Sequence, residues 1–492
     1  MPEPSSSFKV VQVCSVSPPP QNGTTTTTTS SSISMPLSFF DIIWLRFPPV
    51  ERLFFYKFPN YPSSNNSFYD SILPNLKHSL SLTLQHFLPL IGNIIWPSDS
   101  PKPVIRYVPN QDSVTLTIAE SNDNDDGAKV FEQLCSNSCE ASQRYFLVPQ
   151  LAISHEKASL LALQVTLFPK FGFCIGISTH HAAMDGKSST MFMKAWSYTC
   201  SKLLESPSFP SSSLPLPENL TPFLDRSLIK DPTKIGESYG DSWLNHGGTN
   251  NNRSLKVFDF PNEFAKEGYG VKALFELSPT QIMKLKEHAK SKMGGRGTKS
   301  VKLSTFSVTC AYVLSCLVRT EEQQLLENVV KKVLLIFSVD CRTRLDPPIV
   351  STYFGNCIAG ERVEAETKGL LLGNIVNDGF MVALEAIIEG LKRVEDGSVM
   401  NGAETWLSDI MFSFVEGGKI YSIAGSPRFG VYDVDFGYGR PEKVDMTSTD
   451  KTRAFSLSEN KDNNGGIEIG LAMEKSDMEA FSSFFHEGLQ SL

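Results

Sequence analysis

The 492-residue sequence lacks any apolar run of eighteen or more residues, so it predicts no transmembrane helix. It is also poor in basic residues, because 45 Lys and Arg stand against 53 Asp and Glu and give a formal net charge of −8. This balance argues against non-specific nucleic-acid binding, which needs a basic face. Residues 1–20 lack the basic and apolar regions of a signal peptide. We therefore expect a soluble cytoplasmic protein without membrane or nucleic-acid partners.

Several catalytic motifs are absent as well. The sequence has no Walker-type phosphate loop, no dinucleotide glycine fingerprint after a strand and no G-x-S-x-G nucleophile elbow. It has neither HExxH nor CxxC, so we expect no metal site and no bound cofactor. Most of the nine cysteines lie in apolar runs, which is typical of buried free thiols in a reducing compartment. These absences argue against nucleotide-dependent, metal-dependent and covalent Ser or Cys mechanisms.

The chain is too long for one hydrophobic core and predicts two α/β domains of similar size. The Ser- and Pro-rich segment 206–222 is the best linker between domains at 1–205 and 223–492. The low-complexity tract 18–34 is expected to be a loop. Hydrophobic periodicity predicts strands at 8–16, 104–120, 160–179, 271–277, 332–340 and 466–472. It predicts helices at 69–87, 187–205 and 304–319. Capping boxes at 278–281 and at Ser476 predict the starts of two more helices.

The segment GISTHHAAMDGKSST, residues 176–190, contains the most informative pattern in the chain. A predicted strand delivers His180 and His181 to a short loop, Asp185 follows, and a helix begins. Adjacent side chains on a strand point to opposite faces, so the two histidines are not expected to bind one metal ion together. An imidazole accepts a proton near neutral pH, which suits a general base acting on an alcohol or amine. Asp185 could orient that ring or pair with a distant arginine, and spacing does not decide between the two.

A second pattern is DVDFGYGRP, residues 433–441. Asp435, Gly437, Gly439 and Pro441 predict a tight, glycine-supported turn. On the residues alone, a structural loop is favoured over direct catalysis.

These motifs together resemble a known family. HHAAMDG resembles the HxxxDG signature of the plant BAHD acyl-CoA-dependent acyltransferases, and DFGYG at 435–439 is similar to their DFGWG motif, with Tyr438 in place of tryptophan. The order and the separation of about 250 residues also match. YFGNC, Tyr353–Cys357, resembles the mark of the clade that acylates anthocyanins, flavonoid glycosides and related phenolic glycosides. Further blocks that look like the family lie at 38–56, 84–94, 303–313 and 339–348, so the resemblance covers nearly the whole chain.

The resemblance implies a fold of two chloramphenicol-acetyltransferase-like domains. Each would be a mixed β-sheet flanked by helices, and a channel between them would open to CoA on one face and to the acceptor on the other. A crossover loop would join the domains, which fits 206–222. The resemblance also implies a monomer whose partners are acyl-CoA and a phenolic glycoside.

The resemblance also assigns roles to residues. His181 would be the general base that takes the proton from a sugar hydroxyl. His180, which points the other way on the strand, is expected to be a packing residue. Asp435 is a candidate catalytic residue at the second motif, although the family gives this position a structural role. Asp185 would point away from the site and pair with Arg342, with Arg344 as the rival, and Asn356 would shape the channel wall. Further candidates for support of the site are Gly186, Gly437 and Gly439, and for acyl-CoA binding Lys187, Ser304, Thr305 and Arg440.

The sequence is compatible with two classes of acyl donor. Malonyl-CoA is the first expectation, and its free carboxylate would need a cation because an unpaired buried charge is costly. Lys187 is the nearest candidate in sequence, and Arg440 is another. A hydroxycinnamoyl-CoA donor would instead need an apolar pocket. A non-catalytic binding protein on the same fold is the rival from another class.

Overall fold

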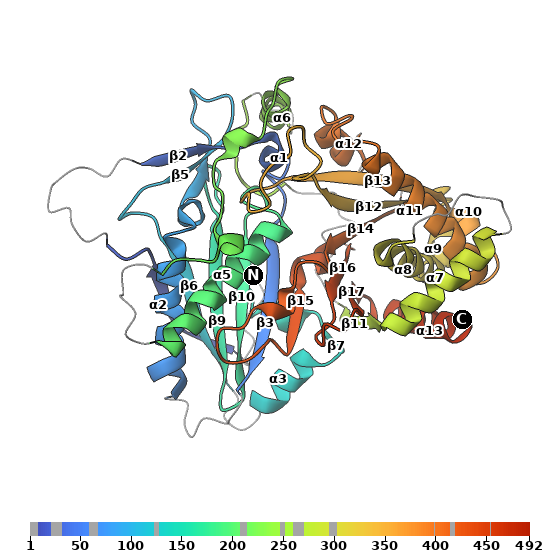
Figure 1. The fold of residues 1–492 in the computed structure, drawn as a ribbon, viewed down its shortest axis with the longest axis horizontal. Coiled ribbons are helices and arrows are strands. Elements are labelled where there is room, and N and C mark those ends of the chain that lie inside the picture. The colour runs from blue at the N-terminus through green and yellow to red at the C-terminus, as the bar shows by residue number, and fades with distance from the viewer. Residues whose placement is uncertain are drawn as a thin grey trace.

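A computed structural model of the chain describes residues 8–20, 32–58, 67–122, 127–206, 214–246, 251–258, 270–294, 303–397, 399–413, 419–452 and 454–492. Two large mixed sheets lie side by side and helices cover them (Figure 1). The helices are α1 (Phe39–Ile42), α2 (Leu73–Leu84), α3 (Gly127–Cys135), α4 (Ser142–Tyr145), α5 (Gly186–Glu205), α6 (Ile235–Leu244), α7 (Pro279–Gly294), α8 (Thr305–Thr320), α9 (Glu322–Glu327), α10 (Thr367–Leu370), α11 (Phe380–Glu395), α12 (Trp406–Ser413) and α13 (Lys475–Gln490).

The first large sheet carries the histidine pair. Its hairpin of β9 and β10 is buried along its whole length, as expected for apolar strands covered on both faces. In the described part of the chain the strand order is β1 (Phe8–Val16), β6 (Val114–Ser121), β9 (Leu161–Phe168), β10 (Gly172–Thr179), β3 (Val50–Lys57) and β15 (Lys443–Met446). A smaller sheet has the order β2 (Ile33–Pro36), β5 (Val104–Tyr107), β4 (Asn93–Ile95) and β8 (Lys157–Ser159).

The second large sheet lies mostly in the C-terminal half, where α7, α8, α11 and α13 gather around it (Figure 1). Its order is β13 (Ile358–Glu366), β12 (Lys332–Asp340), β14 (Lys419–Gly425), β16 (Ala454–Glu459), β17 (Ile467–Met473), β11 (Val271–Leu277) and β7 (Ser138–Glu140).

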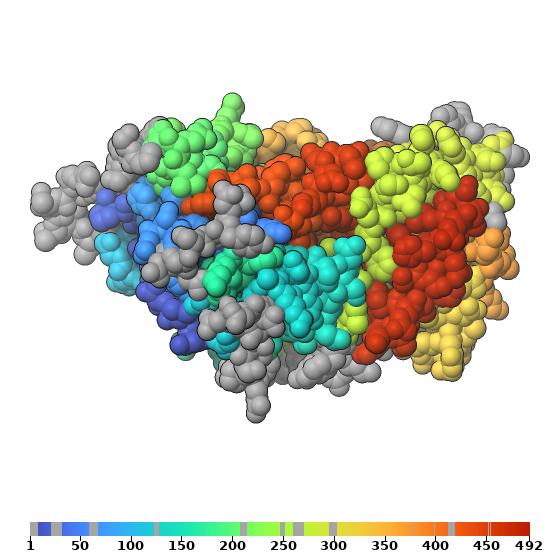
Figure 2. Space-filling view, turned by 90° about the horizontal axis from the view of Figure 1, so that it is seen from below, coloured from blue at the N-terminus to red at the C-terminus, as the bar shows by residue number. Residues whose placement is uncertain are grey.

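The two large sheets exchange strands across the predicted linker. β15, from the C-terminal half, pairs antiparallel with β3, and β7, from the N-terminal half, pairs antiparallel with β11. Figure 2 shows the orange and red C-terminal segments extending over the blue and green N-terminal half. The sheets are therefore not divided at the expected linker, 206–222, because each contains a strand from the other side of it. Of this linker, residues 207–213 lie outside the described residues.

A buried cluster of charges lies where the strands are exchanged. Arg144 of α4 pairs with Asp445 of β15 and with Asp450, and Lys272 of β11 pairs with Asp450 at 3.1 Å. Lys443 donates to the carbonyl of Ser136 at 2.8 Å. Buried charges are costly unless they are paired and hydrogen-bonded, and here Arg144 and Lys272 reach two aspartates from distant parts of the chain. The cluster therefore links the two sheets.

Most expected elements are present, with two differences at their ends. The capping box at Ser278 is formed, since its backbone N–H donates to Gln281 Oε1 at 2.8 Å and its hydroxyl accepts from the Gln281 N–H. The prediction of a capping box at Ser476 is wrong, because α13 already begins at Lys475 and its N-cap is Glu474. Of the tract 18–34, residues 21–31 lie outside the described residues and Ile33 begins β2. Among the described helices, none is long and apolar enough to cross a bilayer.

Candidate active site

The two histidines occupy different environments at the end of β10. His180 is 1% exposed, and its Nδ1 accepts a hydrogen bond from the Ala182 N–H at 3.2 Å. His181 remains partly exposed. The pair thus separates as expected for adjacent residues that leave a strand. His180 packs in the interior, and His181 is the more exposed of the two.

The His181 ring stacks on an indole that the sequence reasoning did not single out. The rings of Trp44 and His181 lie 4.0 Å apart between centroids, with an interplanar angle of 9°. Trp44 follows α1 and also makes an edge-on contact with the ring of Phe47, at 5.1 Å between centroids. His181 Nδ1 is buried without a hydrogen-bond partner in the described part of the chain. The flat stack therefore fixes the plane of the imidazole.

The surroundings of His181 keep its imidazole neutral. Burial lowers the pKa of His181 to about 4, while a contact with its own backbone carbonyl and the charge of Asp185 raise the pKa part of the way back. Burial and the neighbouring His181 lower the pKa of His180 to about 3. A neutral imidazole has a lone pair that can accept a proton, so His181 is ready to act as a base at neutral pH.

We expect these pKa values to set the response to acid. Because His181 stays neutral above about pH 4, kcat/KM for acyl transfer should hold its plateau from pH 8 to about pH 5. Both histidines have lower pKa values in the fold than in the unfolded chain. The unfolded state therefore binds more protons below about pH 6.5, and stability falls as the pH falls from there toward about 3.

The measurement is a profile of kcat/KM against pH, with the unfolding free energy measured at each pH so that loss of folded enzyme is not counted as loss of chemistry. An activity limb with its midpoint near pH 6.5 in fully folded protein would contradict this assignment of the His181 environment.

A buried polar chain holds the backbone of His181. Asn356 Nδ2 donates to the His181 carbonyl at 2.9 Å and to Asp41 Oδ1 at 3.0 Å. Asp41 is fully buried and pairs with Arg226 at 3.1 Å. We expected Asn356 to shape the channel wall, but it is fully buried and lies beneath the loop. Its amide therefore positions the carbonyl that the His181 ring contacts.

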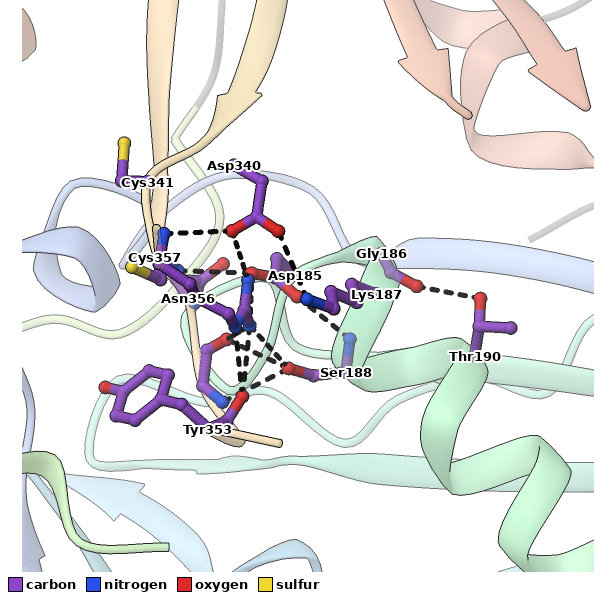
Figure 3. A network of polar contacts seen from close by, with 12 residues as sticks. Asp185, Gly186, Lys187, Ser188, Thr190, Asp340, Cys341, Tyr353, Asn356 and Cys357 are labelled. Atoms are coloured by element: carbon purple, nitrogen blue, oxygen red, sulfur yellow. Dashed lines mark hydrogen bonds and ion pairs between the residues drawn. The ribbon is translucent and has the colours of Figure 1, made fainter. Parts of the chain in front are cut away.

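Both carboxylate oxygens of Asp185 make structural contacts. One carboxylate oxygen accepts from the Ser188 N–H at 2.9 Å and so caps α5, and the other pairs with Arg342 at 2.8 Å (Figure 3). Arg344 is exposed and donates to the Asp340 carbonyl instead. Of the two roles that the sequence left open for Asp185, the structure shows the pairing with Arg342. The same guanidinium donates to the carbonyls of Tyr353 and Gly355, so it also ties down the YFGNC segment.

The two residues after Asp185 have different environments. A side chain at Gly186 would begin 2.8 Å from the ring of Phe429, so only glycine fits without displacing that ring. Lys187 is one-third exposed, and its Nζ lies 3.2 Å from Asp340 Oδ2 (Figure 3). Its charge is therefore already compensated.

The second motif forms a closed loop far from His181. Asp435 Oδ1 accepts from the backbone N–H groups of Gly437 and Gly439 at 2.8 and 3.0 Å, and both glycines have positive φ, 89° and 103°. Ser201 of α5 donates to the Asp435 carbonyl at 2.9 Å. Ser201 lies about 22 Å along α5 from its first residue, by the helical rise. The candidate catalytic role of Asp435 is therefore not supported, because its carboxylate is committed to its own loop.

We expect Asp435→Ala to act through this loop. Losing two hydrogen bonds to an ionised carboxylate should lower the unfolding free energy by about 2–4 kcal/mol. The midpoint of the acid limb of kcat/KM should not move, because His181 keeps its surroundings. Thermal unfolding and the pH profile of the variant check both statements, and a shifted acid limb would place Asp435 in the proton transfer after all.

The remaining candidates lie apart from the histidine loop. Tyr438 accepts from Asn75 of α2 at 3.4 Å, so the residue in the tryptophan position faces that helix. Arg440 donates to the Tyr432 carbonyl and pairs with Asp433 at 2.9 Å. At the start of α8, the Ser304 hydroxyl accepts from the Ser307 N–H at 3.0 Å and the Thr305 hydroxyl accepts from Lys286 at 3.0 Å. No group of three or more possible metal ligands occurs among the described residues.

The chain is similar to known proteins over nearly its whole length. The Transferase family model matches residues 24–487. Phenolic glucoside malonyltransferase 1 of Arabidopsis thaliana is 35% identical over 505 residues, covering 99% of each chain. This chain belongs to the BAHD acyltransferases. It is an acyl-CoA-dependent acyltransferase, as the two motifs predicted.

Two further comparisons bear on the donor and the fold. Coumaroyl-CoA:anthocyanidin 3-O-glucoside-6''-O-coumaroyltransferase 1 of A. thaliana is 33% identical, covering 98% of this BAHD chain and 97% of its own. Vinorine synthase superposes with a TM-score of 0.63 at 18% identity, covering 96% of each chain. The structural likeness supports the expected two-domain α/β fold.

Proposed function

We propose that this acyltransferase transfers an acyl group from acyl-CoA to a sugar hydroxyl of a phenolic glycoside such as an anthocyanin or flavonoid glucoside. The acyl group that we propose first is malonyl. The observation that carries the proposal is the neutral, partly exposed imidazole of His181, which Trp44 and Asn356 hold in one orientation. The malonyltransferase relative and the YFGNC segment support the choice of substrates.

In the proposed reaction His181 is the general base. Its imidazole takes the proton from the sugar hydroxyl as that oxygen attacks the thioester carbonyl, and a tetrahedral intermediate forms. The intermediate expels the CoA thiolate, which the imidazolium then protonates. The indole of Trp44 faces this imidazolium, and an aromatic face attracts a cation, so the stack stabilises the charge that forms on His181.

We further propose that the enzyme works as a cytoplasmic monomer without a bound cofactor, with malonyl-CoA as co-substrate. Ser304, the N-cap of α8, and Thr305, its first residue, are candidates for acyl-CoA binding because a helix N-terminus favours anions. The second candidate function is transfer from a hydroxycinnamoyl-CoA, which the coumaroyltransferase relative favours.

The test is to incubate the purified chain with a panel of flavonoid and simple phenolic glucosides and with malonyl-, acetyl- and coumaroyl-CoA, and to identify the products by mass spectrometry. A malonyl ester supports the proposal, and a coumaroyl ester alone supports the second candidate. No product from any pair contradicts the proposed acceptor class.

A further inference from the structure

The first sheet contains a buried cation that the site described above does not use. Arg52 of β3 is only 5% exposed, and its Nη1 donates to the Thr190 hydroxyl at 3.2 Å. That is its one hydrogen bond to a described residue, and no described carboxylate lies within ion-pair distance of its guanidinium. Burial lowers the pKa of Arg52 to about 10, so the group remains charged at neutral pH. A buried charge without a partner is costly, which indicates that a ligand supplies the counter-charge.

Arg52 is close to the histidine loop in the fold. It lies opposite Ile177 of β10, and that strand ends two residues before His181. Its hydrogen-bond partner Thr190 donates in turn to the Gly186 carbonyl at 2.8 Å, in the first turn of α5 (Figure 3). On its other side β3 pairs with β15, where Arg52 faces Met446. Arg52 therefore lies between the strand that delivers the base and the strand contributed by the C-terminal half.

The acidic group that acts on Arg52 from the second sheet is Glu459 of β16. One oxygen of Glu459 accepts from the Tyr432 N–H at 3.0 Å, and the other is buried without a partner in the described part of the chain. The charge of Glu459 raises the pKa of Arg52, but the two groups do not form an ion pair. Arg52 therefore keeps its Nε and Nη2 donors for another acceptor.

We propose that Arg52 binds the free carboxylate at the end of the donor's acyl group. A planar guanidinium with two remaining donors matches a carboxylate better than an ammonium group does. The inference deepens the proposed function and rests on it, since it assigns the donor to acyl-CoA thioesters of dicarboxylic acids. Lys187 and Arg440, the cations expected from the sequence, are less suitable because each is more exposed and already paired with an aspartate.

The experiment compares malonyl-CoA with acetyl-CoA, which lacks only the carboxylate. In Arg52→Gln the ratio of kcat/KM for malonyl-CoA to kcat/KM for acetyl-CoA should fall about 10- to 100-fold, the range for one hydrogen-bonded charge. The acetyl-CoA value should change less than about threefold, and Arg52→Lys should recover part of the ratio. Lys187→Ala and Arg440→Ala are the matched variants and should keep the ratio. Equal losses on both donors, or a ratio that falls in Lys187→Ala instead, would overturn the inference.

Two further measurements separate this inference from its alternatives. Glu459→Gln should keep the donor ratio, whereas a fall equal to that of Arg52→Gln would show that the two residues are a structural pair. Calorimetric titration of malonyl-CoA and acetyl-CoA without acceptor tests Arg52 independently of turnover. If Arg52→Gln removes a preference for malonyl-CoA that the wild type shows, the inference stands even when no glycoside is acylated. If the wild type shows no preference, the inference fails even when a glycoside is acylated.

Discussion

His181→Ala is expected to reduce kcat for acyl transfer by about 10²- to 10⁴-fold, the usual contribution of a positioned general base. The side chain is partly exposed and its Nδ1 has no described hydrogen-bond partner, so its removal breaks little of the folded structure. KM for acyl-CoA should change less than about threefold, because the base acts on the acceptor's proton. Steady-state kinetics on both substrates and a thermal unfolding curve measure these effects.

The neighbouring histidine provides the matched control. His180→Asn removes an imidazole from the same loop while keeping an acceptor for the Ala182 N–H. We expect this variant to lose stability and to keep most of its activity per folded molecule. If His180→Asn lowered kcat of the folded protein as strongly as His181→Ala, the assignment of the base to His181 would be wrong.

Asp185→Asn is expected to lower the free energy of unfolding by about 3–5 kcal/mol, the cost of breaking a buried ion pair by removing one partner. Arg342 is 1% exposed, so without Asp185 its charge would lose its only buried carboxylate among the described residues. The asparagine oxygen can still cap α5 at the Ser188 N–H. Activity should fall too, because Arg342 also holds the YFGNC segment whose Asn356 supports His181. Denaturant unfolding and kcat measure the two effects.

Asp340→Asn is the control on the same guanidinium. Asp340 contacts Arg342 at 3.0 Å, but its side chain is 41% exposed. Exposed ion pairs contribute about 0–1 kcal/mol, so this substitution should change the unfolding free energy by less than about 1 kcal/mol. Equal losses from the two substitutions would show that burial does not determine the strength of these pairs.

Periodicity in the sequence predicted the elements that are long and strongly patterned. The hairpin of β9 and β10 and the helices α5 and α8 were found because a continuous apolar run or a helical repeat is a local signal. β13 was not predicted, because its charged residues give this edge strand little apolar character. The exchange of β7 and β15 was not predicted either. These strands have three and four residues, and their partners lie more than a hundred residues away.

The residues of the candidate site were likewise predicted only in part. The resemblance predicted His181, Asp185 and Arg342, since motifs preserve the spacing of such residues along the chain. Trp44 and Arg52 were missed although both lie in the block at 38–56 that resembles the family, because one aromatic ring or one arginine in an apolar block has no special spacing. Only the fold shows that Trp44 stacks on His181 and that Arg52 is buried without an ion-pair partner among the described residues.

The strand exchange also limits how this enzyme can be recombined with its relatives. A chimera joined within 206–222 takes β3 from one parent and β15 from the other, and it divides Arg144 from Asp445 in the same way. Each parent's backbone register and buried charges must then fit a foreign partner. A graft that is meant to transfer donor or acceptor preference should therefore carry residues 443–450 and Lys272 along with the N-terminal half, so that β3 keeps its own β15 and the buried charges keep their partners.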